Sequence, residues 1–128
     1  MRCALLIAAF ALLFAQAQTS DSPLARAQRS DRYGAIAYSW PAAWWGCSSN
    51  YGTQEAADRA AMNDCGRPDC QIVTRFRDAC GALARDSKDT IGWGVGSSRE
   101  DAERSARDNC NKNGGGDCRI LCSPCTLR

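Results

Sequence analysis

Residues 53–70 have the sequence TQEAADRAAMNDCGRPDC, and residues 98–118 repeat its pattern as SREDAERSARDNCNKNGGGDC. Each copy begins with a hydroxyl residue, continues through an Ala-containing, charge-decorated segment to a Cys, and reaches Asp-Cys through a Gly-containing turn. Thr53 is a typical helix N-cap, Ser97-x-x-Glu100 matches a capping box, and Pro68 prevents the first helix from continuing. Each copy therefore predicts a helix followed by a turn into a strand.

Strand-like segments flank each predicted helix at matching positions. They are residues 33–39 (YGAIAYS), 44–51 (WWGCSSNY) and 70–78 (CQIVTRFRD) in the first unit, and 80–86 (CGALARD), 91–96 (IGWGVG) and 118–122 (CRILC) in the second. We therefore expect an α+β fold of two pseudo-symmetric strand–strand–helix–strand units, 33–79 and 80–125. The strands are expected to form a mostly antiparallel sheet, either continuous or in two halves, with both helices on one side of it. Alternation in the third segment places Ile72 and Phe76 on one face and Arg75 and Arg77 on the other.

The first 17 residues resemble a secretory signal peptide. A positive start at Arg2 precedes an apolar run over residues 4–15 and a small-x-small cleavage site, AQA, at 15–17. The run is shorter than the roughly 20 residues that span a bilayer, which disfavours a signal anchor. Residues 18–32 are polar and predict a flexible linker, so residues 33–128 form a single domain. We expect no stable membrane insertion after cleavage, and a secreted or periplasmic location.

Cleavage would remove Cys3 and leave eight of the nine cysteines, an even number that predicts four disulfides in an oxidising compartment. About a hundred pairings are open to eight cysteines. The repeat favours one of them, because Cys65 matches Cys110 and Cys70 matches Cys118. The expected pairs are Cys65–Cys70, Cys110–Cys118, Cys80–Cys125 as a link between the units, and Cys47–Cys122 as the remaining pair.

In the order of the segments that make up its two units, the chain resembles the DUF4189 family of small exported bacterial proteins. The resemblance covers roughly residues 33–125 and rests on the order of YGAIAYS, WGCSSNYG, EAADRAAMNDC, DCQIVTRF, ACGALA, GWGVG and GGGDCRIL. It implies a secreted or periplasmic domain, and it offers no established catalytic residues or shared activity to carry over to this chain. The chain departs from the family pattern at Cys47 and Cys122, which supports an additional disulfide there.

Composition excludes several kinds of chemistry. The chain has no His, so Ser–His and Cys–His nucleophiles and His-ligated metals are absent. The formal charge of +2 comes from Arg residues interleaved with acids, and no basic stripe suited to nucleic acid is present. Alternating Gly92, Gly94 and Gly96 lack the Lys-Ser/Thr of a phosphate loop and favour a strand packed closely under a helix. No cofactor and no metal are expected.

Two enzymatic alternatives stay open. Cys122 and Cys125 have the spacing of a redox motif, but only three residues follow, too few for the helix that activates such a thiol. Carboxylates on the predicted helices could serve a small envelope hydrolase, although their Arg neighbours favour solvated helix faces. These carboxylates are Glu55, Asp58, Glu100, Asp101 and Glu103.

Aromatic residues are the strongest candidates for a binding surface. Five of them lie within residues 38–51, and Trp and Tyr are enriched at interface hot spots. Part of this group is expected in the core. Our candidate surface residues are Trp40, Trp44 and Tyr51, with Arg75 and Arg77 as contacts for an anionic partner. The leading hypothesis is an exported, non-enzymatic interaction module with a protein partner, for which an inhibitor-like or host-directed role is suitable.

Overall fold

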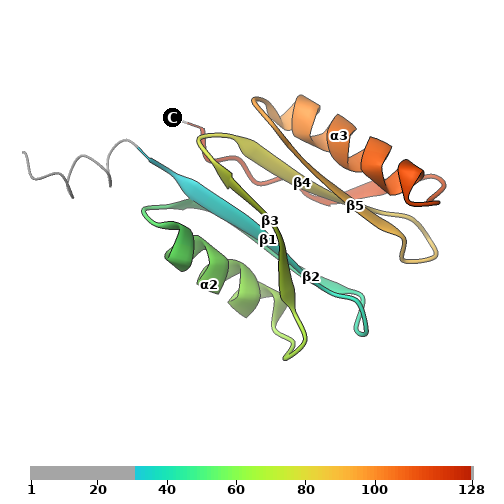
Figure 1. Cartoon of the computed structure of the whole chain (residues 1–128), viewed down its shortest axis with the longest axis horizontal. Coiled ribbons are helices and arrows are strands. Elements are labelled where there is room, and N and C mark those ends of the chain that lie inside the picture. Colours follow the sequence, from blue (N-terminus) through green and yellow to red (C-terminus); the bar gives the residue numbers. More distant parts are fainter. Residues whose placement is uncertain (1–30, 128) are drawn as a thin grey trace, which may run out of the picture.

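The computed structural model describes residues 31–127. The predicted signal peptide and most of the predicted linker lie outside the described residues. The elements are β1 (Tyr33–Ser39), β2 (Trp44–Tyr51), α2 (Gln54–Cys65), β3 (Gln71–Arg77), β4 (Cys80–Arg85), β5 (Ile91–Gly96), α3 (Arg99–Lys112) and β6 (Arg119–Cys122). The order strand–strand–helix–strand occurs twice, so the two-unit α+β fold is confirmed (Figure 1).

Each unit forms its own three-stranded antiparallel sheet. The strand orders are β2-β1-β3 and β5-β4-β6, with the first strand of each unit in the centre. Because the helix connects an edge strand to the opposite edge, it crosses over one face of the sheet. The other face of each sheet is then free to pack against the other unit.

The molecule has four layers in the order helix, sheet, sheet, helix (Figure 1). Small residues form the contacts between each helix and its sheet: Ala35, Ala37, Ala57 and Ala61 in the first unit, and Ala82, Ala84, Ala102 and Ala106 in the second. Large residues fill the space between the sheets: Ile36, Tyr38, Phe76, Leu83 and Ile91, with Trp45 and Trp93 packed against them. The expectation that both helices lie on one side is wrong, because β1 and β4 are apolar on both faces.

Both helices begin at hydroxyl caps. The hydroxyl oxygen of Thr53 accepts a hydrogen bond from the backbone N–H of Ala56 at 3.1 Å. The corresponding cap of α3 is Ser98, which accepts from Asp101 N–H at 3.1 Å, so the N-cap lies one residue after the Ser97 that the capping-box pattern predicts. Gly66 ends α2 with φ of 69°, a conformation in which glycine avoids the Cβ clash of other residues.

The close approach of helix to sheet depends on glycine. A Cβ atom on Gly46 would overlap the backbone of Ala61 and Cys65 in α2, and one on Gly92 would overlap the backbone of Cys110 in α3. Gly94 and Gly96 are under α3 in the same way. The prediction that the alternating glycines of β5 pack closely under a helix is therefore confirmed.

An irregularity in β3 changes which face its residues occupy. The register with β1 skips Val73, so that Thr74 and Ile72 pair with consecutive residues of β1. Ile72 consequently packs on the α2 side, whereas Phe76 packs between the sheets. The expectation that Ile72 and Phe76 share a face is wrong, because strict alternation ends at such an irregularity.

Four disulfides join Cys47–Cys122, Cys65–Cys70, Cys80–Cys125 and Cys110–Cys118. They are the same four pairs that the repeat predicts. Two of them tie the end of a helix to the start of the following strand. The disulfide Cys80–Cys125 lies within the second unit and does not link the units as expected, because Cys80 begins β4 and pairs with Cys125 in a β-bridge.

Candidate functional site

The exposed aromatic side chains separate into two places. Trp40 and Trp44 are 50% and 46% exposed and lie at the turn between β1 and β2. Tyr51 is 39% exposed and lies at the opposite end of β2. The structure therefore places Trp40 and Trp44 at the same end of the β1–β2 hairpin, and Tyr51 at the other end. We call the turn with Trp40 and Trp44 the hairpin end.

Buried aromatic rings support the two exposed indoles. Tyr38 is fully buried and meets Trp40 edge to face at 5.4 Å between ring centroids. Trp45 is half-buried between the sheets and lies 5.2 Å from Trp44. Each exposed ring is thus placed beside a ring that is fixed in the core, which limits its freedom to reorient.

Two arginines lie over tryptophan rings, one over Trp44 of the hairpin end and one over its neighbour Trp45. The guanidinium of Arg67, from the turn after α2, lies 5.7 Å from the Trp44 ring, and that of Arg85 lies 5.0 Å from the Trp45 ring. Arg85 also donates a hydrogen bond from Nη1 to the carbonyl of Ala43 at 2.8 Å. Cation–π contacts of this kind contribute about 0.5–1 kcal/mol at exposed sites. The sequence did not point to either arginine, because Arg67 reaches the hairpin from the turn after α2 and Arg85 from the end of β4.

The predicted arginines Arg75 and Arg77 lie elsewhere. Arg75 donates from Nε to the Asp58 carboxylate of α2 at 2.9 Å. Arg77 lies in the same row across the sheet as Tyr33, whose hydroxyl hydrogen-bonds with it and raises the pKa of the guanidinium. Tyr51 pairs with Tyr33 from the other side. Arg77 is therefore on the Tyr51 side of the first sheet, far from the hairpin end.

A cavity of about 320 Å³ opens at the end of the second sheet. Its lining comes from the end of β4, the turn after it, the loop before β6 and β6 itself: Arg85, Asp86, Ser87, Asp117, Arg119 and Leu121. Arg85 belongs both to this cavity and to the stack on Trp45. The Arg85 side chain therefore lines the cavity and also contacts the hairpin end, through its hydrogen bond with Ala43.

Asp86 shapes the cavity. Its Oδ1 accepts backbone N–H bonds from Lys88 at 3.0 Å and Thr90 at 2.8 Å, and its Oδ2 accepts one from Gly116 at 3.1 Å. Burial alone would raise the pKa of this carboxyl, but the backbone hydrogen bonds lower it below its ordinary value. The charged carboxylate therefore ties the turn after β4 to the loop before β6.

None of the five predicted helix carboxylates lines the cavity, and Asp58, Asp101 and Glu103 have partners of their own. Glu103 accepts from the Ser123 hydroxyl at 2.9 Å, and Asp101 forms an ion pair with Arg104 at 3.0 Å. Within residues 31–127, no three His, Cys, Asp or Glu side chains cluster as metal ligands. No helix of this described part is long and apolar enough to cross a membrane.

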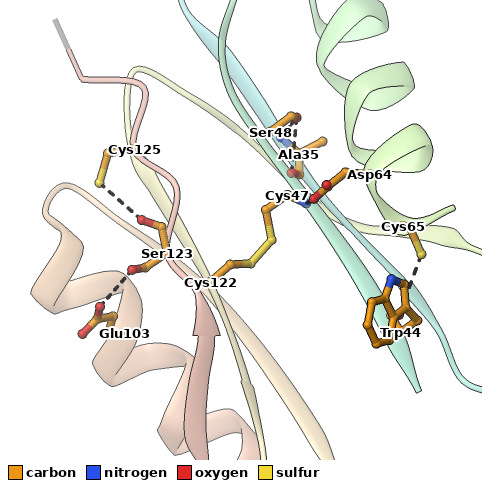
Figure 2. The surroundings of a disulfide bond; sticks show 10 residues. All are labelled: Ala35, Trp44, Cys47, Ser48, Asp64, Cys65, Glu103, Cys122, Ser123 and Cys125. Atoms are coloured by element: carbon orange, nitrogen blue, oxygen red, sulfur yellow. Dashed lines mark hydrogen bonds between the residues drawn. A yellow bond between two sulfur atoms is a disulfide. The ribbon is translucent and has the colours of Figure 1, made fainter. Parts of the chain in front are cut away.

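The predicted redox motif is divided between two disulfides. Cys122 bonds with Cys47 and Cys125 bonds with Cys80. Figure 2 shows the Cys47–Cys122 bond crossing from one sheet to the other while Cys125 lies apart. A dithiol of Cys122 and Cys125 would require both disulfides to open, which argues against the alternative of a thiol–disulfide protein.

Comparison with known proteins identifies the family. A family model described as a domain of unknown function, DUF4189, matches residues 33–125. The chain belongs to the DUF4189 family. The resemblance noted in the sequence is thereby confirmed, and DUF4189 covers both units of the fold.

Relatives of this DUF4189 chain occur in mycobacteria. Protein Mb1300c of Mycobacterium bovis and protein Rv1269c of Mycobacterium tuberculosis are each 42% identical to it over 90 residues, which cover 70% of this chain and 68% of theirs. The solved NMR structure of Rv1813c from Mycobacterium tuberculosis is similar, with a TM-score of 0.56 and 30% identity over 74% of this chain and 75% of that one. The description of the DUF4189 family assigns no function to its members.

Proposed function

We propose that this DUF4189 protein is an exported, non-enzymatic binding module that recognises a protein partner through the hairpin end. The observation that carries the proposal is the exposure of two indoles at one end of the β1–β2 hairpin, Trp40 at 50% and Trp44 at 46%. Exposed large aromatics on a small domain are characteristic of interaction surfaces, and Trp is enriched among residues that dominate binding energy.

The support beneath the indoles fits this role. Tyr38 and Trp45 hold the two rings from inside, and Arg67 covers one side of Trp44. A surface that is already ordered loses little conformational freedom on binding, which favours affinity. An inhibitor-like or host-directed activity would use such a rigid surface directly.

The proposed location rests on the cysteines and on the sequence of residues 1–17. Disulfides persist in oxidising compartments, and four of them in so short a domain are typical of secreted and periplasmic proteins. Secretion or residence in the periplasm is therefore part of the proposal. The predicted signal peptide would provide the route.

A small hydrolase is the second candidate, because two carboxylates, those of Asp86 and Asp117, line the same cavity. Both oxygens of Asp86 accept backbone N–H bonds, and its pKa is lowered. A carboxyl in this state is a poor proton donor, whereas glycoside hydrolysis needs one group with a raised pKa. The binding module is therefore favoured over the hydrolase.

The test compares Trp40→Ala/Trp44→Ala with the intact protein as bait in envelope and secreted fractions. Val95→Ala is the matched control, because Val95 is 44% exposed on β5, away from the hairpin end. A partner retained by the intact protein and the control should bind the double variant at least about thirtyfold more weakly. Equal binding by all three folded proteins would refute recognition through the hairpin end.

A further inference from the structure

Arg85 and Arg119 form a cross-strand pair of like charge. They are register partners in the antiparallel pairing of β4 with β6, and both line the 320 Å³ cavity. Directly opposed residues share one face of a sheet with Cβ atoms about 4.5–5.5 Å apart, and like charges in this arrangement are destabilising. An anion held between two guanidiniums removes that repulsion.

Arg85 is positioned before any ligand arrives. Its Nη1 donates to Ala43, its Nε lies 3.6 Å from the exposed Asp89 carboxylate, and its plane stacks on Trp45. A guanidinium has five N–H donors in a rigid fork, so donors remain free for an oxyanion. These contacts fix the orientation of the Arg85 guanidinium and therefore of its remaining N–H donors.

Arg119 is the less restrained member of the pair. It is exposed, and its guanidinium has no hydrogen bond or ion pair with other residues of the described chain. A long, free arginine beside a fixed one can close over a bound group. Ser87 adds a hydroxyl donor to the lining, and Leu121 adds an apolar wall.

Two carboxylates in the lining limit what can bind. The oxygens of Asp86 are occupied by backbone N–H groups of Lys88, Thr90 and Gly116. Asp117 is exposed, and its negative charge opposes an anion in the cavity. The site therefore suits a small oxyanion that lies between the arginines and away from Asp117, rather than a highly charged polyanion.

We propose that this cavity is a binding site for a small oxyanion, the carboxylate or phosphate group of a ligand, held between Arg85 and Arg119. Bidentate recognition of these groups is the chemistry for which arginine is best suited. The site does not depend on a protein partner at the hairpin end. It shares Arg85 with that surface, but it would use N–H donors of the guanidinium, whereas Trp45 lies against the guanidinium itself.

The experiment titrates the disulfide-bonded protein with inorganic phosphate or with acetate, at ionic strength held constant with chloride. Amide NMR shifts of Ser87, Gly116 and Arg119 report binding in the cavity. Saturable shifts with phosphate alone indicate a phosphate ligand, shifts with acetate alone indicate a carboxylate ligand, and shifts with both support the shared chemistry. Absence of saturable shifts with either ion overturns the proposal.

Three variants test the assignment of residues. Arg119→Gln should weaken binding about tenfold, because one set of charge-assisted hydrogen bonds is lost. Arg104→Gln is the control, since it removes the same charge from the exposed surface of α3. Asp117→Asn should strengthen binding, and asparagine tolerates the φ of 59° at this position. Equal affinity of Arg119→Gln and Arg104→Gln would refute the site.

Discussion

Cys47 of β2 and Cys122 of β6 form the covalent link between the two sheets, across the layer of large apolar side chains. Each cysteine is close to a hydrogen bond with a helix carboxylate, and Ser123, next to Cys122, donates to Glu103 of α3 at 2.9 Å (Figure 2). The backbone N–H of Cys47 donates to Asp64 near the end of α2 at 3.0 Å. The other three disulfides each lie within one unit, so this bond alone among the four holds the repeats together.

Replacing Cys47 and Cys122 together by Ala should lower the free energy of unfolding by about 2–5 kcal/mol, measured by chemical denaturation without reductant. The bond spans 75 residues, whereas Cys110–Cys118 spans 8. Because a longer closed loop restricts the unfolded chain more, the double variant at 47 and 122 should lose about 2 kcal/mol more than the one at 110 and 118. A larger loss for the short loop would contradict this account.

Gly46→Ala should destabilise the protein by about 1–3 kcal/mol, because the new methyl group would overlap the backbone of α2 and force the helix away from the sheet. Gly116→Ala is the matched control. A Cβ atom there meets no heavy atom within 4 Å, and the N–H that Asp86 accepts is retained. Thermal unfolding should place the control close to the intact protein. A similar loss of stability for Gly46→Ala and Gly116→Ala would show that overlap of the new methyl group with α2 is not the cause.

Adjacent tryptophans should respond differently to truncation. Trp45→Ala removes a half-buried ring from the layer between the sheets and should cost about 2–4 kcal/mol in the free energy of unfolding. Trp44→Ala removes a ring that is 46% exposed and should cost about 1 kcal/mol or less. Urea denaturation of the two variants checks the difference. If Trp44→Ala were the more destabilising, the hairpin end would be part of the core and not a free surface.

The order of elements could be predicted because it depends on local pattern. Hydroxyl caps, the glycine at the end of α2 and short alternating segments determine where helices and strands begin and end. The layers could not be predicted in this way. Ala35 and Ile36 are both apolar and lie on opposite faces of β1, and the alternation does not say which face meets a helix and which meets a second sheet.

The candidate site was predicted only in part, for a similar reason. Exposure of Trp40 and Trp44 follows from their place beside the turn at Pro41. Arg67 comes from the turn after α2 and Arg85 from the end of β4, both far along the chain, and only the packing of two units brings Arg85 onto Trp45. Contacts that arise between units leave no periodic signal in either segment.

Tyr38→Phe should leave the free energy of unfolding unchanged or raise it by about 1 kcal/mol. The side chain is fully buried, and its hydroxyl has no hydrogen-bond partner within residues 31–127. A buried hydroxyl without a partner costs free energy, whereas phenylalanine keeps the ring and its contact with Trp40. Chemical denaturation measures the change. A loss above about 1 kcal/mol would mean that the hydroxyl makes a hydrogen bond in solution.

Stability in acid should depend on Asp86. Its folded pKa is lowered from the ordinary value of 3.8, because backbone N–H groups that bind the charged carboxylate outweigh the opposing effect of burial. The unfolded chain therefore binds a proton more readily than the folded chain. The stabilisation is fully present above the unfolded pKa and is lost as the pH falls through the lower folded pKa.

Asp86→Asn tests this dependence, because asparagine keeps one acceptor oxygen but carries no charge at any pH. The variant should be less stable than the intact protein near neutral pH, since both Asp86 oxygens accept hydrogen bonds from backbone N–H groups, and the amide nitrogen of asparagine cannot accept one. Thermal unfolding between neutral pH and about pH 2 should show the two midpoints approaching each other below the unfolded pKa. A difference between the two unfolding midpoints that stays constant over this pH range would mean that the carboxylate does not stabilise the fold through its charge.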